Sequence, residues 1–143
     1  METTQSFNYE PTTPDVFQAL ARVHNVMDAY GLDRKLSHLV LLRASQINRC
    51  WFCVDLHTRE AREDGETSER LDQVIVWDQS DLFSDKERAA LAWTENLTIL
   101  APDAQRGALR DRLKAHFSKE EISVLTATIG MINLWNRIQV SRH

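Results

Sequence analysis

Apolar residues recur every three or four positions along most of the chain, the spacing of one face of an α-helix. The first such stretch follows Thr13 and Pro14, a residue pair that suits the N-cap and the first helical position. Gly31 suits the C′ position that ends a helix, so we expect a helix from about residue 14 to about residue 30. Its apolar positions are Val16, Leu20, Val23, Met27 and Tyr30.

A second helix is predicted from about Arg34 to Ile47, and its centre is apolar on every side. Four consecutive apolar residues, Leu39 to Leu42, leave no polar face there. A helix of this kind is buried all round. We therefore expect it to lie either in the centre of the molecule or at a subunit interface, and we expect the chain to form a homo-oligomer.

Start and stop signals predict the remaining helices. A serine followed three residues later by glutamate, the capping-box pattern, occurs at Ser84 and Ser118 and opens two long helices, over 89–100 and 122–138. We also expect a helix from about Cys50 to Gly65, a short one capped by Thr67, and a polar one from residue 102 to about 115. The short helix carries Leu71, Val74 and Ile75. No stretch alternates strictly enough for a strand, so the sequence predicts one all-α domain, 1–143, folded as a compact helical bundle.

Charge and composition exclude several classes of protein. The net charge of −4 argues against nucleic acid as a partner, because phosphate binding needs a concentrated basic surface. The basic residues between positions 106 and 114 are interleaved with acids and indicate a solvated helix face. No apolar run is long enough to cross a bilayer, and Met1 to Ser6 lack the basic and apolar regions of a secretory signal. We therefore expect a cytoplasmic protein with no membrane partner.

The chain has two cysteines, Cys50 and Cys53, and a close pair in a cytoplasmic protein indicates redox chemistry or metal binding. On a helix, Cys50, Cys53 and His57 share one face, as positions i, i+3 and i+7. The i, i+3 spacing is short enough for a disulfide, whose Cα atoms usually lie ~4.4–6.8 Å apart. A helix N-terminus also favours a thiolate, so either cysteine could have a lowered pKa.

The position of His57 favours Cys53 as the attacking cysteine. His57 is one turn from Cys53 and two turns, ~10.5 Å of helix rise, from Cys50. Long helical side chains lean toward the N-terminus, so the imidazole should serve Cys53 as a base, directly or through one water. The helix dipole alone would favour Cys50, as in thioredoxin-like motifs, and that alternative stays open.

Two other interpretations of the pair need weighing. The cysteines could form half of a structural zinc site, with His57 as third ligand and His38 or His24 as fourth. Such sites usually take their second ligand pair from a compact knuckle, and this chain has no further cysteine. The cysteines could also be inert core residues, but His57 would then have no reason to share their face. We expect no metal and no cofactor.

The segment from Leu36 to Gly65 carries a resemblance to a known family. Residues 44–48 run into the C-x-x-C-x-x-x-H pattern at Cys50, Cys53 and His57, and the similarity continues through 87–95 to 133–137. The pattern resembles the carboxymuconolactone decarboxylase/alkylhydroperoxidase D superfamily, on its alkylhydroperoxidase-like branch, over nearly the whole chain. The resemblance implies an all-helical fold assembled as trimers, dimers or hexamers.

The resemblance also implies roles for the motif residues. The second cysteine, here Cys53, would attack a peroxide and become a sulfenic acid; the first, here Cys50, would resolve it into a disulfide; and His57 would take part in a proton relay. The family's relay often has a glutamate twelve residues before the first cysteine, where this chain has His38. Glu95, in an otherwise apolar helix, is our candidate for the missing carboxylate, the alternatives being that it faces solvent or pairs with an arginine. His38 is either part of the relay or a hydrogen-bonded core histidine.

The favoured function is thiol-dependent reduction of hydroperoxides in antioxidant defence. The expected partners are a small hydroperoxide and a dithiol reductant protein that returns the disulfide to the dithiol. A disulfide-exchange or redox-sensing module that acts on protein thiols is the alternative from another class. A lactone decarboxylase is a less favoured alternative, because that branch does not depend on the cysteine pair.

Overall fold

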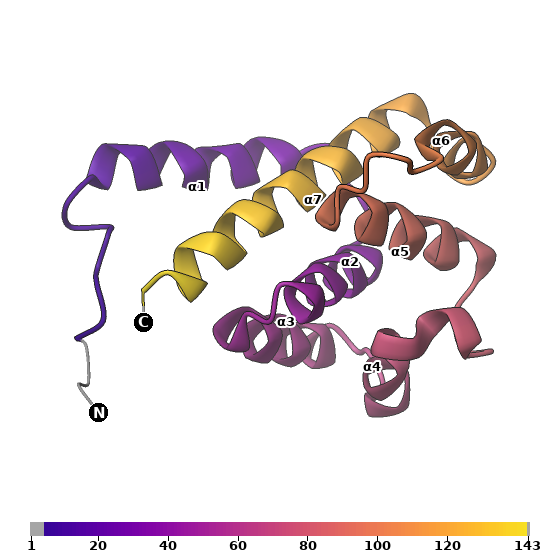
Figure 1. Ribbon diagram of the computed structural model, residues 1–143, viewed down its shortest axis with the longest axis horizontal. Helices are drawn as coiled ribbons and strands as arrows, with labels where there is room; N and C mark the ends of the chain where they lie inside the picture. Colours follow the sequence, from indigo (N-terminus) through magenta and orange to yellow (C-terminus); the bar gives the residue numbers. More distant parts are fainter. Residues whose placement is uncertain (1–4, 143) are drawn as a thin grey trace.

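The computed structural model describes residues 5–142, and all the regular secondary structure of this part of the chain is helical. This confirms the all-α class (Figure 1). The expectation of no secretory signal rests partly on Met1 to Thr4, which lie outside the described residues. The helices are α1 Pro14–Asp28, α2 Arg34–Ile47, α3 Trp51–Glu63, α4 Ser68–Gln73, a 3-10 helix Val74–Gln79, α5 Asp85–Thr98, α6 Arg106–Lys114 and α7 Lys119–Val140.

Helix α2 lies in the middle of the molecule. Asp33 caps its start by accepting a hydrogen bond from the backbone N–H of Lys35 at 2.9 Å. Leu39, Val40 and Leu42 are buried, and the helices packed around them, α3, α5 and α7, belong to the same chain. The central position is therefore confirmed. Because the chain itself covers this apolar helix, α2 offers no argument for an oligomer.

The core lies on two sides of α2. On one side Val40 packs with residues of α5, α6 and α7, among them Trp93 and Ile129. On the other side Leu39 and Leu42 pack with residues that follow them in α3, α4, the 3-10 helix and α5. This arrangement holds α3, which carries the cysteines, firmly against the central helix.

Helix α1 forms where it is predicted, but its apolar positions are not buried. Val16 is 50% exposed, Tyr30, which follows the helix, is 60% exposed, and α1 has no fully buried residue. Figure 1 shows α1 running beside α7 on the outside of the bundle. Phe17 and His24 pack against Trp135 of α7. The homo-oligomer stays a prediction, and α1 rather than α2 carries the exposed apolar surface.

The two capping boxes are confirmed at Ser84 and Ser118, and each helix starts at the next residue. The predicted start of the polar helix, at residue 102, is wrong, and α6 begins at Arg106. The chain turns across Pro102 instead, and the Arg106 guanidinium donates a hydrogen bond to the carbonyl of Ala101 at 3.0 Å.

Two smaller details also differ. Val74 and Ile75 belong to the 3-10 helix rather than to α4, and Gly31, with φ +72°, lies one residue beyond the C′ position of α1. Within residues 5–142, no helix combines enough length and apolar character to cross a membrane.

Candidate functional site

The two cysteines lie at the start of α3. Cys50 is the N-cap residue, and its Sγ accepts a hydrogen bond from the backbone N–H of Cys53 at an N···S distance of 3.3 Å. The structure joins Cys50 and Cys53 in a disulfide, with their Cα atoms 5.3 Å apart. Both residues are buried. The helix start near Cys50 and the pairing that the i, i+3 spacing allows are thus confirmed.

A buried polar network holds the turn between α2 and α3 that presents Cys50. The backbone N–H of Cys50 donates to the carbonyl of Ser45 at 3.0 Å. The Asn48 side chain donates to the side-chain oxygens of Asn133 and Asn136 on α7, each at 2.9 Å. Asn136 in turn donates to the Ser45 hydroxyl at 3.0 Å. Asn133 and Asn136 therefore have a structural role, because their hydrogen bonds join α7 to the end of α2.

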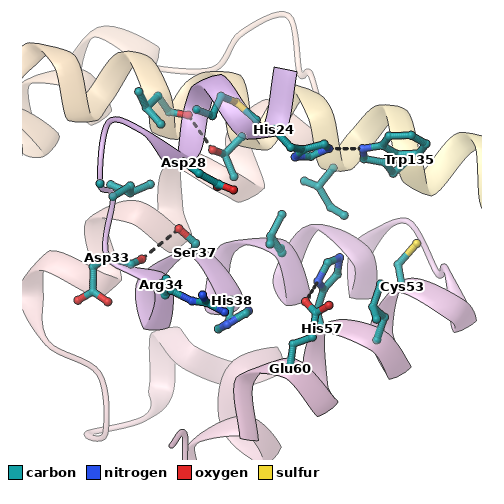
Figure 2. A pocket seen from close by; sticks show the side chains of 18 of the residues that line it. His24, Asp28, Asp33, Arg34, Ser37, His38, Cys53, His57, Glu60 and Trp135 are labelled. Carbon is teal, nitrogen blue, oxygen red and sulfur yellow. Dashed lines mark hydrogen bonds and ion pairs between the residues drawn. The ribbon is translucent and has the colours of Figure 1, made fainter. Parts of the chain in front are cut away.

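A cavity of about 870 Å³ opens between α1, α2, α3 and α7 (Figure 2). Cys53 and His57 line it from α3, His38 lines it from α2, and Trp135 lines it from α7. Its other walls are largely apolar, formed among others by Met27, Leu41, Phe52, Leu56 and Ile132. Cys50 does not line this cavity, so the two sulfurs differ in their surroundings.

His57 is mostly buried beside Cys53. Its side chain is 13% exposed, and its Nδ1 lies 3.5 Å from Oε2 of Glu60, an ion-pair distance that is too long for a hydrogen bond. Burial lowers the pKa of His57, because desolvation disfavours the charged imidazolium, while the Glu60 carboxylate opposes this in part. The imidazole is therefore neutral near pH 7 and able to accept a proton.

His38 is paired with a carboxylate that follows α3. Its Nε2 lies 2.6 Å from Oδ2 of Asp64, which also accepts a hydrogen bond from Arg34 at 3.0 Å. The hydrogen bond from His38, together with the Arg34 charge, lowers the pKa of Asp64 and keeps it ionised. The other ring nitrogen of His38, Nδ1, is buried without a hydrogen-bond partner among the described residues.

The structure does not bring Glu95 to this cavity. Its Oε1 accepts hydrogen bonds from Arg43 Nε at 2.9 Å and from Trp77 Nε1 at 2.7 Å, and Glu95 is not among the cavity residues. Glu95 therefore pairs with an arginine, which is one of the two alternatives given for it. The carboxylate ties α5 to α2 and to the 3-10 helix, so the expectation that it replaces the relay glutamate is corrected.

Two carboxylates that the sequence analysis missed stand beside the histidines. Glu60 approaches His57, and Asp64 binds His38. The signal for Glu60 was present, because His57, Glu60 and Asp64 continue the stripe of Cys50 and Cys53 along one face at spacings of three and four. The pairing of Asp64 with His38 joins residues 26 apart and needed the tertiary structure.

The residues considered for zinc have other contacts. His38 binds Asp64, and His24 accepts a hydrogen bond from Trp135 Nε1 at 2.7 Å. Within the described range, 5–142, no group of three or more His, Cys, Asp or Glu side chains is arranged to hold a metal ion.

Comparison with known proteins agrees with the motif. Residues 14–96 match the model of the carboxymuconolactone decarboxylase family. The chain is 30% identical to the uncharacterized protein YdfG of Bacillus subtilis, over 96% of this chain and 94% of that protein. It is 42% identical to the uncharacterized protein YnjA of Escherichia coli over 72% of this chain, but it spans only 56% of that longer protein.

A solved structure is also similar. The protein ATU0492 of Agrobacterium tumefaciens, of unknown function but suggested to be the antioxidant defence protein AhpD, superimposes with a TM-score of 0.91 at 39% identity, over 97% of this chain and 95% of that one. With this fold, the Cys50–Cys53 disulfide and the matched family model, the chain belongs to the carboxymuconolactone decarboxylase family, on its AhpD-like branch.

Proposed function

We propose that this protein is a thiol-dependent peroxidase that reduces organic hydroperoxides at Cys53. The observation that carries the proposal is the Cys50–Cys53 disulfide at the start of α3, with Cys53 facing a cavity that also holds the neutral base His57. A reducible disulfide beside a ligand-sized cavity and a proton acceptor supports peroxide reduction.

In the first step, His57 accepts the proton of the Cys53 thiol. The thiolate attacks the terminal oxygen of the hydroperoxide, the O–O bond breaks, and Cys53 becomes a sulfenic acid. The leaving alkoxide takes the proton from the His57 imidazolium and departs as an alcohol. The Glu60 carboxylate stabilises the imidazolium by its charge, because it lies 3.5 Å from Nδ1.

In the second step, the Cys50 thiol condenses with the sulfenic acid, releasing water and forming the disulfide. The Cα separation of 5.3 Å allows this bond without movement of the helix start. A dithiol protein then reduces the disulfide and completes the cycle. No cofactor takes part.

The cavity favours an organic hydroperoxide over hydrogen peroxide. Ligand pockets usually have volumes of about 300–1,000 Å³, and the cavity, at about 870 Å³ with mostly apolar walls, falls in that range. His38 lines the cavity, is held in place by Asp64 and has its Nδ1 without a partner, so this nitrogen provides a polar contact for a hydroxyl or hydroperoxyl group that enters.

The test is mass spectrometry of the reduced protein after one equivalent of cumene hydroperoxide. We expect the wild-type protein to lose two hydrogens as the disulfide forms, without covalent dimers. Cys50→Ser should keep a sulfenic acid on Cys53 that dimedone traps, and Cys53→Ser should not react. A dimedone adduct on Cys50 of the Cys53→Ser protein would make Cys50 the attacking residue, as the helix dipole alone predicts.

Two further measurements separate the alternatives. Steady consumption of peroxide with a regenerating dithiol distinguishes a peroxidase from a module that only exchanges disulfides with protein thiols. Elemental analysis of protein purified without added metal tests the zinc interpretation: one tightly held zinc per chain, whose removal unfolds the protein, would contradict the redox cycle.

A further inference from the structure

Helix α3 separates the cavity from a second hollow on its other side. This second hollow, an open groove of about 670 Å³, is lined by Arg49, Cys50 and residues of α3, and none of these residues lines the cavity. At 100° per residue, Cys53, His57 and Glu60 lie on one face of α3, and Trp51, Asp55 and Arg62 lie on the opposite face. Cys53 lines the cavity, whereas Cys50, the N-cap residue that precedes α3, lines the groove.

The groove is positively charged, although the chain has a net charge of −4. It contains three arginines, Arg49, Arg59 and Arg62, and one acid, Asp55. Arg59 lies 3.6 Å from Asp55, whereas Arg49 and Arg62 form no ion pair within residues 5–142. A local excess of unpaired arginines is complementary to an acidic partner and speeds its approach.

Trp51 stands in this groove with 79% of its surface exposed. An exposed tryptophan beside arginines is a composition typical of the residues that contribute most to protein–protein binding. Trp51 directly follows Cys50, so a protein that covered this indole would bring its own side chains next to the disulfide.

The backbone of Arg49 supports a use for its side chain. Arg49 has φ +54°, in the left-handed region that favours glycine. The other two residues with positive φ, among the described ones, are glycines, Gly31 and Gly65. An arginine is less stable in this conformation than glycine, and the chain nevertheless places a cation there, at the edge of the groove.

We propose that this groove docks the acidic flank of a protein dithiol, which reduces the disulfide by attacking Cys50. The inference rests on the proposed function and adds where the reductant binds and what charge it carries. Because Cys50 is only 1% exposed, the reductant's cysteines must stand on a protruding loop or arm that enters the groove, not on a flat surface.

The exchange balances without any further reactant. A thiolate of the partner attacks Sγ of Cys50, the Cys50–Cys53 bond breaks, and Cys53 leaves as a thiolate. The partner's second thiol then loses its proton and attacks the partner's first sulfur, which is bonded to Cys50 in the mixed disulfide. Cys50 leaves as a thiolate, which the backbone N–H of Cys53 stabilises. The partner ends as a disulfide, and Cys50 and Cys53 end as the dithiol after taking up two protons.

The test compares the reduction of the oxidised protein by three probes at low salt. The probes are a C-x-x-C peptide flanked by glutamates, the same peptide flanked by lysines, and neutral dithiothreitol. For Arg59→Gln/Arg62→Gln we expect the rate with the acidic peptide to fall about three- to tenfold relative to wild type, and the fall to shrink as salt is added. The rates with the other two probes should not fall. The acidic and basic peptides differ in the pKa of their thiols. Each rate is therefore compared with the rate of the same peptide on wild-type protein, so that this difference cancels.

The control variant is Arg112→Gln, which removes one charge from an exposed position of α6 outside the groove. It should leave all three rates unchanged. A second measurement identifies the sulfur: a monothiol version of the acidic peptide should form a mixed disulfide that mass spectrometry locates on Cys50.

Equal rates with the acidic peptide in wild type and the groove variant, or a mixed disulfide on Cys53, would overturn the proposal. So would a change in oligomer mass of Arg59→Gln/Arg62→Gln by light scattering, because the groove would then contact a second copy of this chain. Failure of the proposed function is separate, since the oxidation of the reduced protein by cumene hydroperoxide involves no reductant. If Cys53 did not react with cumene hydroperoxide but the acidic peptide still reduced the wild-type disulfide faster than that of the groove variant, the protein would be a disulfide-exchange module instead.

Discussion

Replacing His57 by glutamine removes the base from the cavity while keeping a polar side chain of similar reach. His57 lines the cavity one helical turn after Cys53, and burial lowers its pKa so that it is neutral near pH 7. A base that must be neutral works above its pKa, so the lowered pKa extends the active range of the wild-type protein toward acidic pH. In His57→Gln the Cys53 thiol must ionise without this help.

The size of the effect follows from the thiol. With an ordinary pKa of about 8.5, a thiol is about 3% thiolate at pH 7, so a variant that depends on this fraction alone reacts about thirtyfold more slowly than a protein whose base removes the thiol proton during the reaction. Loss of proton delivery to the leaving alkoxide adds to this, up to the ~10²–10⁴-fold usual for a positioned general base. At about 1.36 kcal/mol per factor of ten, the whole range is about 2–5 kcal/mol of activation free energy.

The assay is stopped-flow oxidation of the reduced protein by cumene hydroperoxide across a range of pH. Wild type should be nearly flat down to mildly acidic pH, whereas His57→Gln should be slow at neutral pH and recover much of the rate at alkaline pH. His116→Gln, a histidine outside the cavity, is the matched control and should behave as wild type. A variant as fast as wild type at pH 7, or one that stays equally slow at alkaline pH, would refute His57 as the base.

Three further substitutions test other parts of the site. Glu60→Gln removes the charge that raises the pKa of His57, so this pKa should fall further, the acid limb of the pH–rate profile should move to lower pH, and the plateau rate should drop. Glu95→Gln should lower the free energy of unfolding by about 1–2 kcal/mol in urea, because Arg43 loses its ion pair, and should leave the rate of Cys53 oxidation unchanged. Arg49→Gly should raise the free energy of unfolding by about 1 kcal/mol, because glycine adopts the left-handed backbone conformation of residue 49 more easily than arginine does. The same variant should be reduced more slowly by the acidic peptide.

Many helix starts and the redox motif were predictable, because both depend on residues close in the chain. Asp33 caps α2, the serines of the two capping boxes start α5 and α7, and Cys50 begins α3, each through hydrogen bonds that span at most three residues. The alignment of Cys50, Cys53 and His57 follows from the helical repeat alone. Local geometry of this kind does not require knowledge of how helices pack.

What surrounds the motif was decided by the tertiary structure. The sequence by itself determined that α1 is a helix with an apolar stripe, but only the packing shows that Val16 and Val23 of this stripe stay exposed while Met27 lines the cavity that holds Cys53. Glu95 was a reasonable relay candidate from its apolar helix, yet Arg43, 52 residues away, takes its carboxylate, while Asp64 comes to His38. Buried charges and hydrogen-bonding groups need partners. Which partner is within reach depends on the helices that hydrophobic packing brings together. Because this packing is non-directional, it leaves no local signal in the sequence.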